Sequence, residues 1–559
     1  MKKIYIKSLF AALAIICFTG CTKDLDLIPK DTLSDAMYWT QASDFEKGAN
    51  ALYSVLPRPS TADLNSDIAF TYPNSVSNST LTTPETDGNW NNAYVQIRNC
   101  NNLIEKASVS PIAAEIKVSV AEAKFFRAYN YWSLYRLYGG VPVITKVLDI
   151  NSEELYGTRN SAQETVDFIL QNLREAAPDL PEENQVPATS RGRITRGAAN
   201  AFLARIALFE GTWRKYRNEA GADSYLDMAV SAAGTVINSG QYALFTGEGA
   251  DSYLKLFDYA GDNVAENILT RKYQYLVDYN NAPQLFQQMG YLPTKQLADM
   301  YVCSDGLPVD RSPLFKGYEM RTSEFENRDP RMSQTLMIPG TVAYAPLQIE
   351  PLEHWPFYPD RVYTTGYILR KFMTQNPENA MMLQTGIDHH IIRYAEVLLI
   401  YAEALYEKNG SISDDDLNKT VNQLRQRGGL NTLLTNAFVT ANGLNMRDEI
   451  RRERTVELAL EGFRRDDLRR WKTAEIELKK AIRGIKIVGT QWGTEPIMVQ
   501  EQEKNVYMTA EYQSRADAEG FYVSEAASAR SGFTDKNYLM PLPTKEIQLN
   551  PNLQQNPGW

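Results

Sequence analysis

Residues that could carry acid–base, nucleophilic or metal chemistry are few in this chain of 559 residues. Its three histidines are His354 and the neighbours His389 and His390. Adjacent residues of a helix point to different sides, so this pair cannot form the i,i+4 ligand set of a zinc protease, and we expect it at the start of a helix instead. No P-loop, GxGxxG fingerprint or GxSxG elbow occurs. Because 68 Asp and Glu residues guarantee coincidental carboxylate pairs, the sequence predicts no enzyme activity, no cofactor and no metal ligand.

Lipid chemistry is indicated at the N-terminus instead. Three lysines precede an apolar run at residues 9–18, which is too short to span a bilayer and has the layout of a signal peptide. The sequence Phe18-Thr19-Gly20-Cys21 resembles a bacterial lipobox, whose cysteine is acylated and becomes the first residue of the mature protein. We expect residues 1–20 to be removed and Cys21 to carry palmitate, with residues 21–41 as the lipidated tether. The alternative is an ordinary secretory signal followed by an incidental cysteine.

The composition narrows the class of protein and its partners. Hydrophobic residues make up 43% and aromatic residues 11% of the chain, which is typical of a globular protein. The formal net charge is −10 and no basic block interleaved with aromatic residues occurs, so we do not expect nucleic acid as a partner. Cys100 and Cys303 remain after the leader and the lipidated residue, and they could form one disulfide or stay as buried thiols.

The rest of the chain is organised around a predicted helix at residues 121–138. Its apolar positions recur at steps of three and four, and further aromatic residues fill much of the remaining surface, so this helix should be buried on several sides. Gly139, Gly140 and Pro142 end it. We therefore expect a core helix.

Other helical periodicities lie on both sides of this element, separated by clusters of Gly, Pro, Asn and Asp. Pairs of helices with alanines where they cross are typical of tetratricopeptide repeats, here degenerate in spacing and without the full consensus. The first helix should be capped by Ser43 or Asp44. The expected helices span about 43–56, 91–107, 161–177, 195–210, 224–239 and 390–408, and a further one opens at 414.

A charged segment at residues 446–472 interleaves nine basic with seven acidic residues. Opposite charges stand four positions apart in the favourable order, which favours a helix crossed by salt bridges over a phosphate-binding face. The expected pairs are Asp448–Arg452, Glu461–Arg465 and Asp466–Arg470.

Periodicity fails in stretches rich in Tyr, Pro, Gly and Asn, which contain only short strand-like runs such as 366–372. We expect a mainly α protein with a tetratricopeptide-like scaffold and an irregular, loop-rich cap that contains a few short strands. The expected parts are the scaffold at 42–240 with an inserted loop at 57–89, the cap at 241–388, the last repeat pair and charged helices at 389–484, and the C-terminal part of the cap at 485–559.

Several motifs resemble the SusD/RagB family of Bacteroidetes outer-membrane lipoproteins. The stretch 121–145, down to its Gly-Gly-Val-Pro exit, is similar to the signature helix of that family. The most specific match is the C-terminal stretch 538–546 with the Asn-Pro pairs at 550–551 and 556–557. Further matches follow in the expected order at 253–257, 329–331, 366–372, 393–399, 421–427 and 451–471.

The resemblance implies a SusD-like cap on a repeat scaffold, and a lipid-anchored position on the exterior of the outer membrane. It also implies a role in polysaccharide utilisation: binding oligosaccharides and delivering them to a SusC-like TonB-dependent transporter. Two alternatives are a RagB-like lipoprotein that binds peptides for the same kind of transporter, and a repeat scaffold for protein partners.

A sugar site needs exposed aromatic rings for the apolar faces of the sugar, with amides or carboxylates around them for its hydroxyl groups. The irregular stretches supply such residues, although any single ring could equally belong to the core of the cap. The candidate ligand-binding residues are Asp67, Tyr72, Asn78, Trp90, Tyr279, Tyr291 and Trp355.

Overall fold

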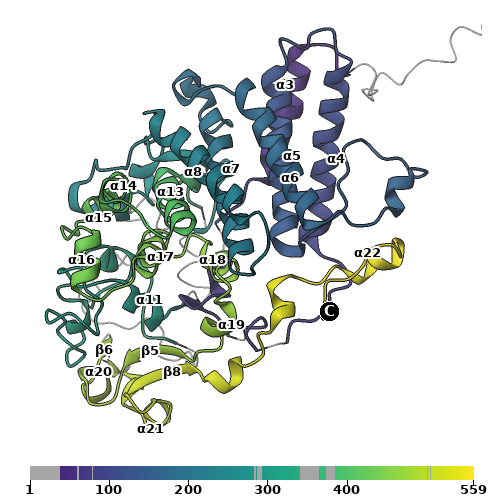
Figure 1. Cartoon of the computed structure of the whole chain (residues 1–559). Helices are drawn as coiled ribbons and strands as arrows, with labels where there is room; N and C mark the ends of the chain where they lie inside the picture. The colour runs from purple at the N-terminus through teal and green to yellow at the C-terminus, as the bar shows by residue number, and fades with distance from the viewer. Residues whose placement is uncertain are drawn as a thin grey trace, which may run out of the picture.

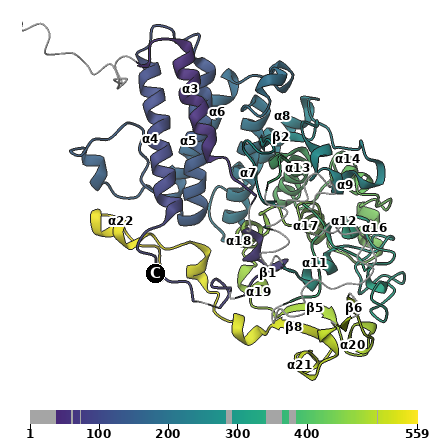
Figure 2. The ribbon, with the colours of Figure 1, turned by 180° about the vertical axis from the view of Figure 1, so that it is seen from behind.

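The computed structural model describes residues 38–59, 62–72, 74–78, 80–282, 285, 292–339, 364–372, 384–499, 502–503 and 505–559. Long helices dominate these ranges, and each strand in them belongs to a two-stranded antiparallel pair. A row of long helices lies beside a region of shorter helices and strands (Figures 1 and 2). The predicted mainly α fold, with a repeat scaffold and a loop-rich cap, is confirmed.

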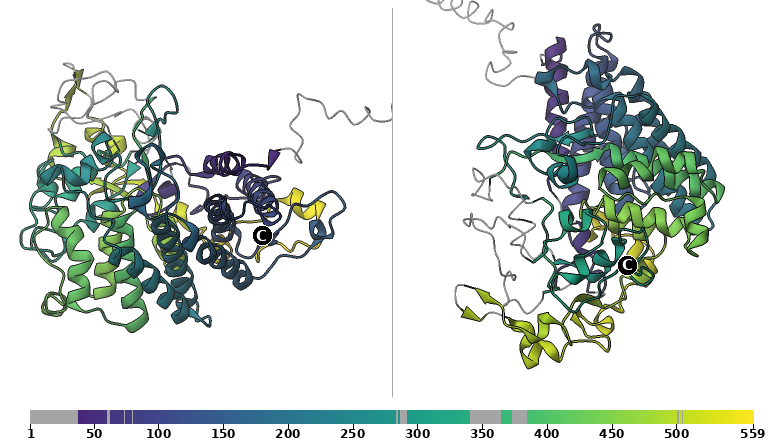
Figure 3. Two further views of the ribbon diagram at one scale, coloured as in Figure 1. Left: turned by 90° about the horizontal axis from the view of Figure 1, so that it is seen from above. Right: turned by 90° about the vertical axis from the view of Figure 1, so that its left-hand side faces the viewer.

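The scaffold helices pack side by side, and α13 (Tyr394–Asn409) and α17 (Met446–Glu457) continue the row beyond α8 (Ala222–Asn238) (Figure 3). Within the described residues, no helix combines the length and the apolar character that crossing a membrane requires. The scaffold helices are α3 (Ala42–Leu52), α4 (Gly88–Ser108), α5 (Lys117–Tyr138), α6 (Ala162–Ala176), α7 (Arg196–Lys215), α8 (Ala222–Asn238), α13 (Tyr394–Asn409), α14 (Asp414–Lys419), α15 (Val421–Arg427), α16 (Asn436–Ala441), α17 (Met446–Glu457) and α18 (Arg464–Arg470).

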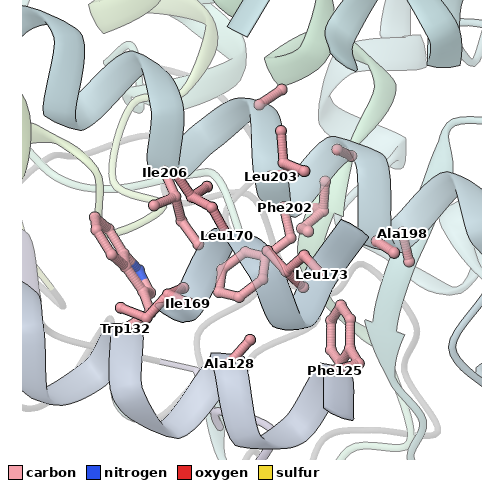
Figure 4. Close-up of a cluster of buried hydrophobic side chains, with 14 of the residues drawn as sticks. Phe125, Ala128, Trp132, Ile169, Leu170, Leu173, Ala198, Phe202, Leu203 and Ile206 are labelled. Carbon is pink, nitrogen blue, oxygen red and sulfur yellow. The ribbon is translucent and has the colours of Figure 1, made fainter. Parts of the chain in front are cut away.

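Helix α5 is the predicted core helix. Its Phe125 and Trp132 point toward Ile169 of α6 and Phe202 of α7 in one close-packed cluster (Figure 4). Full burial of such side chains contributes about 1.5–3 kcal/mol each. Ala128 lies among them and lets the neighbouring helices approach closely.

The glycines after α5 have distinct roles. Gly139 adopts a left-handed φ of 75° and its N–H donates to Tyr135 O at 2.8 Å, which closes the helix. A Cβ on Gly140 would lie 2.2 Å from the backbone oxygen of Asn160, so only glycine fits there. The carbonyl of Tyr138 accepts hydrogen bonds from Arg159 Nη2 and Asn556 Nδ2, which tie the helix end to the C-terminal segment.

Two predicted helix starts differ from the structure. The N-cap of α3 is Gln41, with Asp44 as its reciprocal capping partner, so Ser43 and Asp44 are not the cap. His389 and His390 lie in strand β4 (His389–Arg393), which pairs with β2 (Asn267–Arg271), so the prediction that they start a helix is wrong. Helix α13 begins only at Tyr394, whose N–H donates to Glu266 O.

The prediction of one helix crossed by salt bridges at 446–472 is also wrong. Helices α17 and α18 are separate, and Leu460 and Gly462 take left-handed φ angles of 65° and 89° between them. The three predicted i,i+4 pairs do not form in this fully described segment. Half of its charged residues are instead buried, and several pair with other elements, as when Arg470 Nη1 donates to Glu403 of α13 at 2.5 Å.

A buried ionic network joins α17 to the cap. Glu457 accepts from Arg331, Arg393 and Arg427, and every one of these side chains is at most 6% exposed. The network balances five cations against five anions: Arg331, Arg393, Arg425, Arg427 and Lys371 with Asp329, Glu266, Glu453, Glu457 and Glu461. Such a balanced set avoids an uncompensated buried charge.

The two parts of the cap share one hydrophobic core. Leu297, Tyr301 and Leu336 of the first part pack with Ile485 and Tyr522 of the second. The described residues at 366–372 form no strand, only an isolated bridge between Leu336 and Leu369. The cap elements are β1 (Ala69–Phe70), α9 (Ser252–Lys255), β3 (Leu292–Pro293), α11 (Lys295–Met300), α12 (Arg331–Thr335), α19 (Ala474–Glu477), β5 (Ile482–Lys486), α20 (Gln491–Thr494), β6 (Met498–Val499), β7 (Gln502–Glu503), α21 (Ala510–Gln513), β8 (Phe521–Glu525) and α22 (Thr544–Leu549).

Both candidate partners of a disulfide are free thiols. Cys100 lies in α4 and Cys303 in the cap, and each is buried. Burial raises the pKa of the Cys100 thiol to about 12, so it behaves as a small apolar side chain.

Candidate ligand-binding face

Exposed aromatic and aliphatic side chains gather on a hairpin in the cap, residues 272–280. Tyr275, Leu276, Val277 and Tyr279 are 39%, 62%, 72% and 41% exposed. Leu276 has a left-handed φ of 62°, an uncommon conformation for a bulky residue. Keeping such side chains in water, with a strained backbone at the tip, is typical of a binding surface.

The hairpin is held in place by hydrogen bonds at its base. Asn280 exchanges backbone bonds with Thr385 at 3.0 and 2.8 Å, and its Nδ2 donates to Ile387 O at 2.9 Å. A Cβ on Gly386 would lie 2.6 Å from the backbone nitrogen of Tyr275, so glycine is required for this close approach. The aromatic rings are therefore presented by a fixed backbone, which lowers the entropy cost of binding.

Charged groups surround the first strand of the hairpin. Asp388 accepts from the backbone N–H of Tyr273 and forms an ion pair with Lys272. Burial is the main cause that raises the pKa of Asp262 to about 7, and the negative charge of Asp388 adds to it. Arg271 Nη1 donates to Leu56 O at 2.5 Å, which fastens the hairpin to the segment after α3.

A small cavity of about 30 Å³ lies beneath this face and is lined by Asn280, Asp388 and both histidines of β4. Burial is the main cause that lowers the pKa of His389 to about 3, and electrostatic repulsion from His390 adds to it, so this imidazole is neutral at ordinary pH. His390 Nε2 lies 2.8 Å from Leu256 O. The described ranges contain no group of three or more His, Cys, Asp or Glu placed to hold a metal ion.

The predicted residues Asp67 and Tyr72 lie on one segment next to β1, which pairs with β3. Tyr72 is 48% exposed. Asp67 is buried and forms a two-pronged ion pair with Arg464 at 2.7 and 2.8 Å, so its carboxylate serves the core and cannot receive a ligand hydroxyl. Burial opposes ionisation of Asp67, but Arg464 holds its pKa below the usual value.

The remaining predicted residues are scattered. Asn78 is half-buried and accepts from the backbone and hydroxyl of Thr80, so it shapes its own turn. Trp90 is 4% exposed and packs against Tyr138 with ring centroids 5.3 Å apart. This ring therefore belongs to the scaffold core and is not an exposed ligand-binding ring. Cys21, Tyr291, His354 and Trp355 lie outside the described residues.

The face thus contains one predicted ring, Tyr279, and one that the sequence did not single out, Tyr275. The sequence signal for Tyr275 was only its place in a tyrosine-rich irregular stretch. What separates it from buried Tyr273 two positions earlier is exposure, which depends on the fold.

Comparison with known proteins agrees with this architecture. A model described as the SusD family matches residues 256–559, and one described as starch-binding associating with outer membrane matches residues 31–208. SusD-like protein P38 of Formosa agariphila is 26% identical over 546 residues, which covers 87% of this chain and 95% of the relative.

Solved structures show the same fold. A SusD-like carbohydrate binding protein of Bacteroides fragilis has a TM-score of 0.71 at 24% identity, covering 92% of this chain and all of that chain. A laminarin binding SusD-like protein has a TM-score of 0.58 at 20% identity, and the match covers 93% of this chain and all of that chain. The motif-based resemblance is confirmed, because a family model matches more than half of the chain, and the protein belongs to the SusD family.

Proposed function

We propose that this protein binds oligosaccharides at the face formed by the 272–280 hairpin and delivers them to a SusC-like TonB-dependent transporter of the outer membrane. The observation that carries the proposal is the pair of exposed rings, Tyr275 and Tyr279, on a firmly anchored hairpin. Sugars offer apolar C–H faces to such rings. Neither tyrosine hydroxyl has a hydrogen-bond partner among the described residues, so both are available to sugar hydroxyl groups.

The names of related proteins support the ligand class. One matching model is described as starch-binding, and two proteins of the same fold are described as carbohydrate binding and laminarin binding. The description of the first also names association with the outer membrane, which supports lipid attachment through Cys21 and a position at the cell surface.

The test is binding of the soluble form, residues 22–559, to a glycan array and a peptide library in parallel. We expect glycan binding that falls at least about tenfold in the double variant Tyr275→Ala/Tyr279→Ala, because each ring contact contributes about 1 kcal/mol. Met320→Ala, at a 53% exposed position elsewhere, is the matched control. Binding of peptides alone, or glycan binding unchanged in the double variant, would refute the proposal.

The transporter step has its own test. Gentle detergent extraction of the native lipoprotein should recover one TonB-dependent transporter with it. Recovery of the lipoprotein alone, under conditions that preserve other membrane complexes, would contradict this step.

A further inference from the structure

A larger cavity lies on the scaffold, away from the hairpin. It has a volume of about 470 Å³, within the range of small-ligand sites, and lies between α4, the connection 142–156 and the C-terminal helix α22. In Figures 1 and 2 this connection projects beside α4, and α22 lies below it. We call this cavity the scaffold groove.

The floor of the scaffold groove is aromatic. Tyr94 of α4 lies against the buried ring of Trp90, with ring centroids 5.1 Å apart, and Ile97 and Leu553 complete the floor. Tyr94 is oriented by a hydrogen bond from its hydroxyl to Pro142 O at 2.9 Å. The floor is therefore fixed before any ligand arrives.

The rims of the scaffold groove leave apolar surface in water. Tyr156 is 57% exposed and Leu155 42% exposed on one side, and Leu549 of α22 is 62% exposed on the other. The hydroxyl of Tyr156 has no partner among the described residues. An ordered aromatic ring in this position, facing an aromatic floor, provides a second surface for a flat apolar ligand face.

Unpaired groups of opposite charge also line the scaffold groove. Arg98 donates to Leu148 O at 2.5 Å but has no carboxylate partner within the described chain. Glu546 of α22 has no cationic partner there either. Burial raises the pKa of Tyr94 most, and Tyr131 and the charge of Glu546 raise it further, while Arg159 opposes them. Donors and an acceptor thus border the same aromatic floor.

This combination selects among ligand classes. An apolar helix laid in the groove would bury Arg98 and Glu546 without partners, which is costly. A simple ion would be attracted by one of them and repelled by the other. A neutral sugar satisfies both, because its hydroxyl groups donate and accept, while its C–H face covers the rings.

We infer that the scaffold groove is a second saccharide-binding site, independent of the 272–280 hairpin, in which Tyr94 and Tyr156 contact the sugar faces while Arg98 and Glu546 bind hydroxyl groups. This inference extends the proposed function, since both sites would engage the same class of ligand. A chain with two separated sites would hold a long glycan more tightly than either site alone.

The test uses ¹⁹F NMR of the soluble form labelled with 5-fluorotryptophan, with the Trp90 signal assigned by Trp90→Phe. Laminarihexaose and maltohexaose are the probes. We expect a saturable shift of the Trp90 signal with at least one of them, persisting in Tyr275→Ala/Tyr279→Ala. The sugar affinity obtained from this shift should fall at least about tenfold in Tyr156→Ala/Glu546→Gln. It should not fall in Val109→Ala, which alters an exposed residue at the far end of α4.

The outcomes separate the two sites. A Trp90 signal unmoved by both sugars at millimolar concentration, or a shift unaffected by Tyr156→Ala/Glu546→Gln, overturns the groove inference whatever the hairpin does. A Trp90 shift abolished by the hairpin variant also overturns it, since the groove would then not be independent. Sugar binding at the groove with no effect of the hairpin variant on overall affinity would refute the proposed function at the hairpin and leave the groove inference standing.

Discussion

Glu457 is the central anion of the buried ionic network, and its replacement tests how that network stabilises the fold. Its carboxylate accepts from Arg331 Nη1 at 3.0 Å, Arg393 Nη1 at 2.7 Å and Arg427 Nη2. Glu457→Gln keeps the shape and removes the charge, so five buried cations would face four anions. Breaking a buried pair costs about 3–5 kcal/mol, because the partner charge is left uncompensated.

The magnitude can be converted to a melting temperature. With an unfolding entropy of about 2 cal/mol/K per residue, a loss of 3–5 kcal/mol lowers the Tm of a chain of this length by roughly 3–5 °C. The control is Asp227→Asn, which removes the exposed partner of Lys408, its side chain being 57% exposed. Surface pairs contribute about 0–1 kcal/mol, so the control should lower Tm by about 1 °C at most.

The pH dependence provides a second measurement on the same variant. Burial alone would raise the pKa of Glu457, but Arg427, Arg393 and Arg331 hold it well below its usual value. A lowered folded-state pKa gives stability that is present above about pH 4.5 and is lost as the pH falls further. Circular dichroism melts between pH 3 and pH 8 should therefore show the difference between wild type and Glu457→Gln shrinking in acid. A difference from Asp227→Asn of less than about 1 °C at pH 7 would refute this reasoning.

The folded-state pKa of Asp262 is raised to about 7, so the stability that this carboxyl contributes is present below about pH 4 and is lost as the pH rises to 7. Between pH 5 and pH 8 the Tm of Asp262→Asn should therefore fall less than the Tm of wild type. An equal fall of Tm in both proteins would contradict the raised pKa of Asp262. Gly140→Ala places a Cβ against backbone and should lower the free energy of unfolding, measured in urea, by about 1–3 kcal/mol. Gly234→Ala in α8, whose Cβ would lie 3.5 Å from Tyr401, should leave this free energy unchanged or raise it. Similar effects of both variants would contradict the packing argument. Cys21→Ala should move the protein to the soluble fraction, and its retention with the outer membrane in cells that lack the transporter would rule out lipid anchoring.

The sequence predicts the elements whose cause is local. Helix α5 is recognisable because its apolar period and its Gly-Gly exit are both written in consecutive residues. The histidine pair was misassigned because β4 exists only through β2, which lies more than a hundred residues earlier. Likewise, the partners of the charged segment 446–472 lie on α13, β4 and the cap, so spacing within the segment suggested the wrong pairs.

The residues of the candidate site also differ in how far local sequence could predict them. Residue type and the irregular context singled out Tyr279, which is exposed on the hairpin, but they could not distinguish it from Trp90, whose ring fills the scaffold core. Asp67 illustrates the limit most clearly, since its carboxylate is taken by Arg464, almost four hundred positions away. Exposure and long-range pairing decide which polar and aromatic residues remain available to a ligand, and neither is visible in local sequence.

The buried network and the ligand-binding face are connected through strand β4. Arg393 at the end of this strand binds Glu457 and Glu461, and His389 and His390 at its start border the cavity beneath the 272–280 hairpin. Lys371 joins the same network, with its ammonium among the rings of Tyr253, Phe257 and Phe372. We expect a set of paired buried charges to favour one arrangement of these segments, because any other arrangement would leave charges uncompensated. The network therefore holds the base on which the hairpin stands without the exposed rings of Tyr275 and Tyr279, which leaves these rings available for the proposed binding.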